Sequence, residues 1–326
     1  MTPETESRNG KSGERTAVVV SAHRMYPTLE RCLGGFQALV ADPADLIFVR
    51  NGPSSELSHL VAERFPGCTQ VSLGENAYFC GGYNAGIRLA LERNLYDFVL
   101  IANADTEVIN PSFVHSLREA AKRWPRAAFL GPLVYLDHAG MLQITCLRYP
   151  SVLRDAAIWF PWRLARGVLP TQPDHECEVE FLNGVCVLCR VAALTDIGLM
   201  DETFGGYVED ADWSWRAQAK GWSSVFSPVP SIIHHEAPEG YEHYSLKSFL
   251  LKRNTVFWFL KVGRRHSATL YARASLCLAR LRLLGAQPAE SDRYRHFLRR
   301  LTRAFNGLLA GETPGDWFGP PLGAWE

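Results

Sequence analysis

Two short acidic stretches of the 326-residue chain carry the side chains best suited to chemistry. The first is Asn103-Ala104-Asp105, which follows a run of apolar residues, and the second is Glu209-Asp210-Ala211-Asp212. A carboxylate such as Asp105 at the end of a buried strand suits a hard divalent cation. Neighbouring carboxylates repel one another, and partial burial raises their pKa values toward those of a general base. The sequence therefore offers a candidate cation ligand and, in Asp210, a candidate proton acceptor.

Each stretch also has a purely structural reading. Asn, Asp and Thr are typical turn residues, so the first stretch equally fits a turn that caps the next helix. The second fits the first turn of a helix, where the helix dipole tolerates negative charge. Arg216 is spaced to pair with Asp212 at i,i+4, which would leave Asp210 the freer carboxylate. The residues alone leave these alternatives open.

A pair of adjacent histidines is a further candidate for metal binding. His234 and His235 follow the apolar residues Ile232 and Ile233. Adjacent side chains point to opposite sides of an extended chain, so only one histidine of the pair can face a site. A histidine after a strand is usually a satisfied polar residue, but it also suits a transition-metal ion.

Strand and helix patterns alternate over the first hundred residues. This alternation predicts an α/β fold with a doubly wound, mostly parallel sheet, which binds ligands at the carboxyl ends of its strands. Glycines between residues 74 and 86 predict either a phosphate-binding turn before a helix or a simple tight loop. The predicted strands are 16–21, 46–49, 69–73, 98–102, 128–132, 179–189 and 222–226, and the predicted helices are 28–39, 55–65, 87–92, 113–123, 191–197, 246–261 and 268–284.

Charge is distributed unevenly along the chain. The net charge is zero, yet residues 240–310 hold 14 Lys and Arg residues against three acids. This basic segment is a candidate for contact with anions, such as a lipid surface or a phosphate-bearing acceptor, and a solvated helical face is the alternative. In its last predicted helix the apolar positions are 270, 274, 277, 278 and 281.

The cysteines and the N-terminus indicate a cytoplasmic protein. Eight cysteines without framework spacing predict reduced thiols, and Cys186 and Cys189 would lie on opposite faces of a strand. Residues 1–14 lack the apolar core of a signal peptide and predict a disordered leader. No apolar run is long enough to span a bilayer. We expect a cytoplasmic location, with peripheral contact at the inner face of the membrane through the basic segment.

Several motifs occur together in one order along residues 16–261. They are Ser21-Ala22-His23-Arg24, Arg50-Asn51-Gly52-Pro53, Asn76-Ala77-Tyr78-Phe79, Gly82-Tyr83-Asn84-Ala85-Gly86, Asn103-Ala104-Asp105, Phe181-Leu182-Asn183-Gly184, Met200-Asp201-Glu202, Tyr207 to Asp212, Pro228 with His234, and Arg253-Asn254. In this order they resemble the family 2 glycosyltransferases, and within them the rhamnosyltransferase-like branch. Two positions depart from the family pattern: Arg50 stands where an acid is usual, and the opening turn lacks a Tyr-Asn pair.

The resemblance implies a GT-A fold and an inverting glycosyl transfer from a nucleotide-diphosphate sugar to an acceptor hydroxyl. It implies Asp210 as the catalytic base, and Asp105 with His234 as ligands of Mg²⁺ or Mn²⁺. The donor would be dTDP- or UDP-linked, with dTDP-rhamnose among the candidates. The implied substrate-binding residues are Ser21, His23, Arg50, Asn51, Asn76, Gly82, Asn84, Asn103, Gly184, Glu209 and Arg253.

The same resemblance divides the chain and suggests its partners. We expect a leader over residues 1–14, a GT-A domain over 15–262, and a basic helical extension with a tail over 263–326. The acceptor would be a glycan, a lipid-linked intermediate or a small natural product. We expect no nucleic acid, and a homodimer is a candidate assembly. The main alternative is a non-catalytic sugar-nucleotide-binding subunit, whereas an oxidoreductase is disfavoured because no Gly-x-Gly-x-x-Gly follows the first strand.

Overall fold

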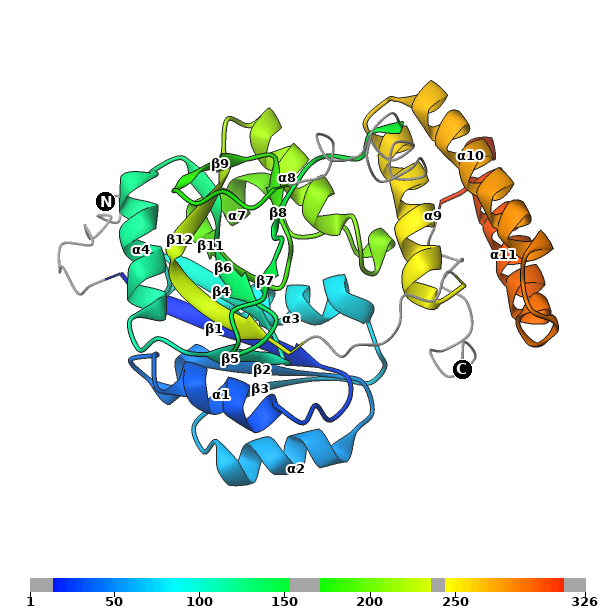
Figure 1. The fold of residues 1–326 in the computed structure, drawn as a ribbon. Coiled ribbons are helices and arrows are strands. Elements are labelled where there is room, and N and C mark those ends of the chain that lie inside the picture. The colour runs from blue at the N-terminus through cyan, green and yellow to red at the C-terminus, as the bar shows by residue number, and fades with distance from the viewer. Residues whose placement is uncertain (1–13, 153–170, 236–243, 314–326) are drawn as a thin grey trace, which may run out of the picture.

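A single large β-sheet lies at the centre of the molecule (Figure 1). The computed structural model describes residues 14–152, 171–235 and 244–313, so the expected leader and most of the tail lie outside the described residues. The strands are β1 (Thr16–Ala22), β2 (Leu46–Asn51), β3 (Thr69–Leu73), β4 (Phe98–Asn103), β5 (Thr106–Val108), β6 (Ala127–Tyr135), β7 (Leu142–Gln143), β8 (Cys146–Leu147), β9 (Cys177–Val179), β10 (Phe181–Leu182), β11 (Cys186–Arg190) and β12 (Ser223–His234).

The strand order combines a parallel half with a mixed half. The order is β3-β2-β1-β4-β11-β6-β12-β5, with β7 beside β6 and β9 beside β12. Strands β3, β2, β1 and β4 are parallel, as the sequence predicts. Strand β11 then runs antiparallel to both β4 and β6, whereas β6 and β12 are parallel to one another. The carboxyl end of β4 therefore lies next to the amino end of β11, which brings Asn103 close to the turn before Cys186.

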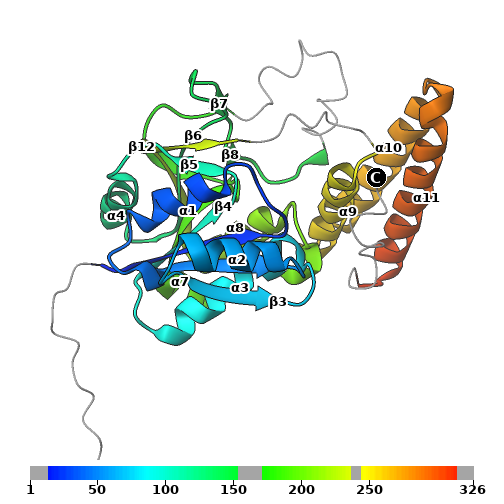
Figure 2. The ribbon, with the colours of Figure 1, turned by 90° about the horizontal axis from the view of Figure 1, so that it is seen from below.

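Helices cover both faces of the sheet (Figures 1 and 2). Buried residues of α1 (Leu29–Gln37), α2 (Ser55–Arg64) and α4 (Phe113–Arg123) form one core with the sheet. Those of α3 (Tyr78–Arg93), α7 (Val191–Ile197), α8 (Glu209–Ala219) and α9 (Leu246–Lys261) form the other. Because both faces are covered, the central residues of β1 (Ala17 to Val20) and of β4 (Phe98 to Ala102) are all apolar. Cys186 and Cys189 fall in different cores, as expected for positions three apart on a strand. Two short 3₁₀-helices cover Pro43–Asp45 and Glu202–Phe204.

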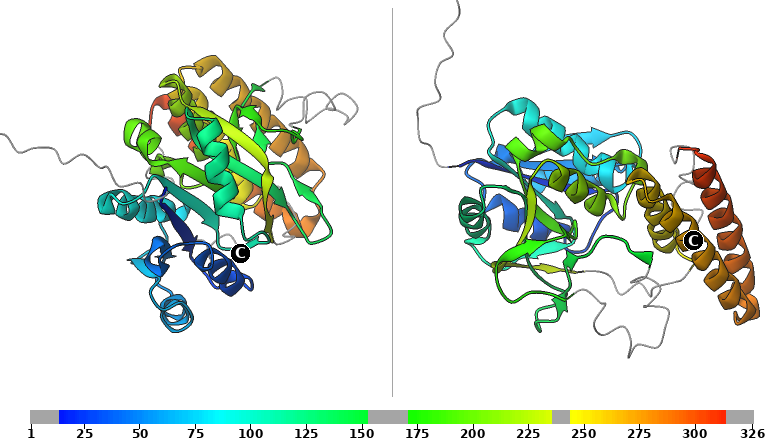
Figure 3. Two further views of the ribbon diagram at one scale, coloured as in Figure 1. Left: turned by 90° about the vertical axis from the view of Figure 1, so that its left-hand side faces the viewer. Right: turned by 90° about the horizontal axis from the view of Figure 1, so that it is seen from above.

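Three long helices form a layer beside the sheet (Figure 3). They are α9, α10 (Arg265–Leu284) and α11 (Pro288–Ala310). Trp258 of α9, Tyr271 of α10 and Phe297 of α11 belong to the same core as Ile101 of β4. This layer is therefore joined to the sheet by continuous apolar packing. None of the described helices has the length and apolar character that a membrane span needs.

Three local predictions from the sequence were wrong. Helix α3 starts at Tyr78, so the glycines expected to form a turn lie inside a helix. The strand expected over residues 179–189 is broken, and Gly184 lies in a turn between β10 and β11. Helix α10 is buried through Ala268, Tyr271, Ala272, Ser275 and Ala279, because these mostly small residues let α9 and α11 approach closely. Three of its predicted apolar positions, Leu270, Cys277 and Leu281, are exposed instead.

The glycines inside α3 allow the helix to contact the sheet directly. A Cβ atom on Gly86 would clash with the side chain of Val19 on β1 and would lie 3.0 Å from Val49 Cγ2 on β2. A Cβ atom on Gly82 would lie 2.5 Å from Ser21 Oγ and 2.6 Å from Asn51 Nδ2. The helix therefore depends on glycine where it crosses the ends of β1 and β2.

We predict that Gly86→Ala destabilises the protein by about 1–3 kcal/mol, because a methyl group is forced into a filled core. The matched control is Gly34→Ala in α1, where the nearest atom, Phe65 Cε1, would lie 3.7 Å from the new Cβ. There the higher helix propensity of alanine should stabilise the protein by up to about 1 kcal/mol. Urea unfolding of both variants tests the contrast. Equal midpoints for the two variants would contradict the close approach of α3 to the sheet.

Candidate functional site

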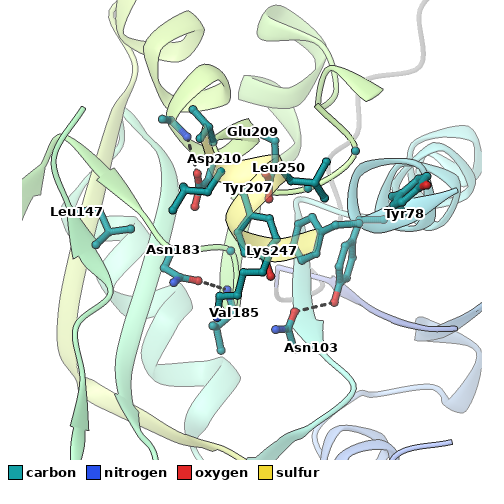
Figure 4. Close-up of a pocket in the computed structure, with 18 of the residues that line it drawn as sticks. Tyr78, Asn103, Leu147, Asn183, Val185, Tyr207, Glu209, Asp210, Lys247 and Leu250 are labelled. Carbon is teal, nitrogen blue, oxygen red and sulfur yellow. Dashed lines mark hydrogen bonds between the residues drawn. The ribbon is translucent and has the colours of Figure 1, made fainter. Parts of the chain in front are cut away.

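A cleft of about 770 Å³ opens at the carboxyl ends of β1 and β4. Loops from both halves of the sheet and one side of α9 form its walls. Asn103 lies at one end of the cleft, and Glu209 and Asp210 lie at the other (Figure 4). Asp105, Asp210 and His234 all line this cleft, so the two acidic stretches found in the sequence share one site.

Asp105 and His234 face one another in the cleft. Asp105 Oδ1 lies 3.2 Å from His234 Nε2, and Asn103 Nδ2 lies 3.5 Å from the same ring nitrogen. Tyr83 donates its hydroxyl proton to Asn103 Oδ1 at 3.1 Å and so fixes that amide. The side chains come from β4, the turn after β4, and the end of β12. Pairing between β12 and β5 holds His234 opposite Thr106, which brings it next to Asp105.

A glutamine sets the orientation of the histidine ring. His234 Nδ1 lies 2.9 Å from Gln143 Oε1 on β7. An amide oxygen only accepts hydrogen bonds, so Nδ1 carries the proton and Nε2 presents its lone pair to the carboxylate of Asp105. Two acceptors that face each other this closely need a cation or a second ring proton between them. Mn²⁺ accepts both imidazole nitrogen and carboxylate oxygen, so these side chains fit a divalent cation.

Asp210 and Glu209 form a coupled acidic pair at the start of α8. Burial raises the pKa of Asp210 to about 6, although three backbone N–H groups, including that of Ala211 at 2.8 Å, oppose the rise. Burial and the neighbouring Asp210 raise the pKa of Glu209 well above its ordinary value. Asp212 behaves differently, because its carboxylate accepts a bond from Arg216 Nε at 2.8 Å and pairs with Lys261 Nζ at 2.8 Å. Asp210 is therefore the carboxylate that titrates near neutral pH at the cleft surface.

The residues just before this pair are held in a strained backbone conformation. Tyr207 has φ 68° and Val208 has φ 73°, which is the left-handed region that β-branched residues rarely adopt. This turn directs the first residues of α8 into the cleft. Such strain persists only where surrounding contacts enforce it.

Two buried residues of α9 supply those contacts. Asn254 Nδ2 lies 2.9, 2.7 and 2.7 Å from the carbonyl oxygens of Phe204, Gly206 and Tyr207. Arg253 Nη2 donates to the carbonyl oxygen of Phe204 at 2.8 Å, and its Nε donates to Asn254 Oδ1 at 2.8 Å. Both side chains are fully buried. Helix α9 thus holds the 203–207 loop through these hydrogen bonds and so fixes the position of Asp210.

Most of the residues that the sequence singled out reach the cleft. Those that line it are Ser21, His23, Asn51, Asn76, Asn103, Asp105, Gly184, Glu209, Asp210 and His234. Four others are not among the residues that line the cleft. Arg50 donates to the carbonyl oxygen of Gly52 at 2.6 Å, and Asn84 donates to the carbonyl oxygen of Met200 at 2.9 Å. Gly82 contacts Ser21 and Asn51, and Arg253 holds the loop described above. Their roles in substrate binding stay predictions.

The structure adds cleft residues that the sequence did not reveal. Gln143 lies on a two-residue strand within a segment that has no clear periodicity. Lys247 and Lys252 line the cleft from α9, where their spacing resembles that of any exposed helical face. Lys252 Nζ donates to Ser248 Oγ at 2.8 Å, and burial lowers the pKa of this lysine to about 8.

A second group of possible metal ligands lies outside the cleft lining. Glu107, His138 and His235 have ligand atoms within 4.8 Å of one another. His235 Nε2 lies 2.7 Å from Glu107 Oε2, and Arg31 Nη1 donates to that oxygen at 3.0 Å. The guanidinium already neutralises this carboxylate, so the group suits a cation less well than the Asp105 and His234 pair. His234 and His235 thus face opposite sides of the strand end, as expected for adjacent residues.

Comparison with known proteins identifies the enzyme class of the molecule. The chain is 29% identical over 265 residues to N-acetylglucosaminyl-diphospho-decaprenol L-rhamnosyltransferase of Mycobacterium tuberculosis, covering 74% of this chain and 85% of the relative. It is 24% identical over 200 residues to the low-salt glycan biosynthesis hexosyltransferase Agl10 of Haloferax volcanii, covering 60% and 61%. The chain is a glycosyltransferase. No family model matches the sequence.

The fold of the glycosyltransferase agrees with this assignment. A crystal structure of GalNAc-T7 with UDP, GalNAc and Mn²⁺ superposes with a TM-score of 0.53 at 11% identity. The match covers 77% of this glycosyltransferase and about half (48%) of that chain. At this identity the likeness concerns the fold alone, and it confirms the predicted GT-A architecture with a helical C-terminal region. The resemblance to the rhamnosyltransferase-like branch is likewise confirmed by the relatives.

We predict that Asp210 contributes to the stability of the glycosyltransferase a component that falls as the pH rises from about 4 to about 6. The pKa of Asp210 is about 6 in the folded state and near 3.8 when unfolded, so ionisation favours the unfolded chain. The contribution of Asp210 to the free energy of unfolding is fully present below about pH 4 and is lost as the pH rises through about 6. Asp210→Asn removes this part of the decline, whereas the control Asp292→Asn on exposed α11 does not. Thermal unfolding across this range measures it, and a pH-independent difference between Asp210→Asn and wild type would contradict it.

Proposed function

We propose that this glycosyltransferase moves a sugar, with inversion, from a nucleotide-diphosphate donor to an acceptor hydroxyl in a metal-dependent reaction. The observation that carries the proposal is that Asp105 and His234 line the same cleft as Asp210. The reaction needs charge neutralisation at a departing diphosphate and proton removal from an attacking hydroxyl. The cleft holds one group of residues suited to each task.

The donor would occupy the end of the cleft formed by the parallel strands. Ser21, Asn51 and Asn76 line that end, and the start of α3 lies beside them. Asn51 accepts a bond from Ala77 N at 2.8 Å and donates to Tyr78 O at 2.7 Å, which fixes this wall. Asp105 and His234 would hold Mg²⁺ or Mn²⁺, and when bound there the cation neutralises developing negative charge on the leaving diphosphate. We propose dTDP or UDP as the nucleotide, with dTDP-rhamnose as a candidate donor.

The proton would be accepted by Asp210. Asp210 is half-buried and lines the cleft, and burial together with Asp210 raises the pKa of Glu209 well above its ordinary value, which favours its neutral form. Two neighbouring carboxyls in different protonation states are a recurring arrangement for acid and base chemistry. Above about pH 6, Asp210 is ionised and able to take the acceptor's hydroxyl proton as the bond to the sugar forms.

The acceptor would enter along α9. Leu250 and Leu251 line this wall together with Lys247 and Lys252, which offers apolar surface beside two cations. The Mycobacterium tuberculosis relative is named for an acceptor that carries a diphosphate and a polyprenol chain. We propose an acceptor of the same chemistry here, with a phosphate facing the lysines. A glycan or a small natural product remains the alternative acceptor class.

We predict that Asp210→Asn lowers kcat by about 10²–10⁴-fold, because the amide accepts no proton, while donor binding stays nearly unchanged. Glu209→Gln is the matched control, since the raised pKa of this neighbour favours its neutral form, and it should keep activity within about tenfold. Wild-type kcat/KM should rise with pH through about 6, following the pKa of Asp210. The assay measures transfer and donor hydrolysis. Equal turnover in the Asp210→Asn variant would remove this residue from the mechanism.

We predict that Asp105→Ala abolishes the part of nucleotide binding that depends on metal. Isothermal titration with UDP and dTDP, each with and without Mn²⁺, separates that part from direct contacts. Wild type should bind at least one nucleotide more tightly with Mn²⁺, and the variant should show the same weak binding in both conditions. Glu63→Ala on the exposed side of α2 is the control. A full Mn²⁺ effect in the variant would exclude Asp105 as a ligand.

A further inference from the structure

The outer side of α10 exposes leucines that the helical layer does not cover. Leu270, Leu281 and Leu284 are 56%, 59% and 84% exposed. With Arg273, Cys277 and Arg280, which are also exposed, they recur every three or four residues and so share one helical face. We call these six residues the α10 stripe. Exposed leucines scattered singly are ordinary, whereas leucines that share one exposed helical face with arginines between them suit an interaction surface.

A groove lined by arginines lies beside the stripe. Arg280 of α10 lines it with Arg299 and Arg303 of α11, and its volume is about 760 Å³. Thr302 and Asn306 add polar side chains, and Glu312 is the acid among its lining residues. We call this the arginine groove. Three guanidinium groups around one concave surface suit phosphate, which arginine binds through paired N–H donors.

Charge decides which partner fits this face. Helix α10 holds four arginines and no acidic residue, and α11 holds five arginines against two acids. A second copy of the chain docked through α10 would bring two cationic rows together. An anionic bilayer offers the opposite charge and an apolar layer below it, which matches arginines that flank leucines. Long arginine side chains also reach outward to headgroups while leucines enter the acyl region.

We propose that the α10 stripe and the arginine groove form a docking surface for an anionic lipid bilayer. The leucines enter the boundary between headgroups and acyl chains, and the arginines bind lipid phosphates. Figures 2 and 3 show α10 and α11 at the edge of the molecule, away from the sheet, where a flat surface can reach them. Tyr271 of the same helix lines the cleft from its buried side, so α10 lies between the docking surface and the cleft.

Cosedimentation of the full chain with vesicles tests the surface without donor or acceptor, so its outcome is separate from that of the transfer assay. Wild type should bind phosphatidylcholine vesicles that contain phosphatidylglycerol and should not bind phosphatidylcholine alone. Binding should weaken as salt is added, because exposed charges are screened. Equal binding to both kinds of vesicle would overturn the proposal.

Paired substitutions locate the surface. Leu281→Ser with Leu284→Ser should lower the affinity for anionic vesicles at least about tenfold, because their apolar area no longer enters the bilayer. Arg280→Gln with Arg299→Gln should lower it by a similar factor through lost electrostatic attraction. Leu95→Ser with Val229→Ser is the matched control, since both side chains are exposed on the sheet-bearing part, and it should bind like wild type.

Two further outcomes would overturn the proposal that this surface docks on an anionic bilayer. The first is unchanged binding of both the leucine and the arginine variants. The second is a wild-type dimer in size-exclusion chromatography that the leucine variant dissociates, with no vesicle binding, since the stripe would then belong to a second copy. All the replaced leucines are exposed, so none of these changes removes a core contact.

Discussion

The hydrogen bonds from Asn254 to three loop carbonyls are the constraint on which the site depends. They fix the backbone of the 203–207 loop. This loop ends at Tyr207, and Tyr207 and the next residue, Val208, both have left-handed backbone conformations. Conformations of this kind cost about 1–3 kcal/mol each and need support from buried contacts. Because Asn254 is fully buried, its amide has no water to exchange for these carbonyls. The position of Asp210 is therefore set by a helix that lies about forty residues later in the chain.

The same arrangement explains how one cleft holds two kinds of acid. Asp105 lies at the solvent-facing end of a strand, opposite a ring nitrogen that lacks a proton, where positive charge is favoured. Asp210 lies at a buried helix start beside a second carboxyl, where its own ionisation is disfavoured and its pKa rises. The pairing of β4 with β11 places Asn103 beside Val185, and the backbone N–H of the preceding Gly184 bonds to Asp210. These contacts join the two acidic stretches, which lie about a hundred residues apart in the sequence. The topology of the sheet thus gives each acid its own environment within a single cleft.

The sequence predicted the architecture better than the details of the site. Long apolar runs such as Phe98 to Ala102 are decided by burial, so their positions were correct. The start of α3 was missed because neighbouring glycines usually interrupt helices, and only the close approach of Gly82 to Ser21 and Asn51 of the sheet explains its place in this helix. Gln143 was missed because a two-residue strand has no periodicity. The left-handed turn before Glu209 contains no glycine at its two key positions, so nothing local indicated it.

The exposed face of α10 shows a different limit of sequence reasoning. Hydrophobic spacing predicts which residues of α10 could be buried together. The neighbouring face carries small residues that allow tighter helix packing, and it is this face that is buried. A helix with two candidate faces therefore has to be resolved by its neighbours, α9 and α11, rather than by its own pattern. The face left outside is then free to acquire a separate role.

Helix α9 combines three tasks that are often assigned to separate parts of a protein. It supplies a wall of the cleft, supports the strained loop and carries α10 and α11. Shortening the gene to obtain a minimal catalytic fragment would thus have to keep residues through at least Lys261. A truncation before Ser245 would preserve every strand of the described sheet and still lose the support of the loop that presents Asp210, so an intact sheet is a poor guide to where such a fragment can be cut.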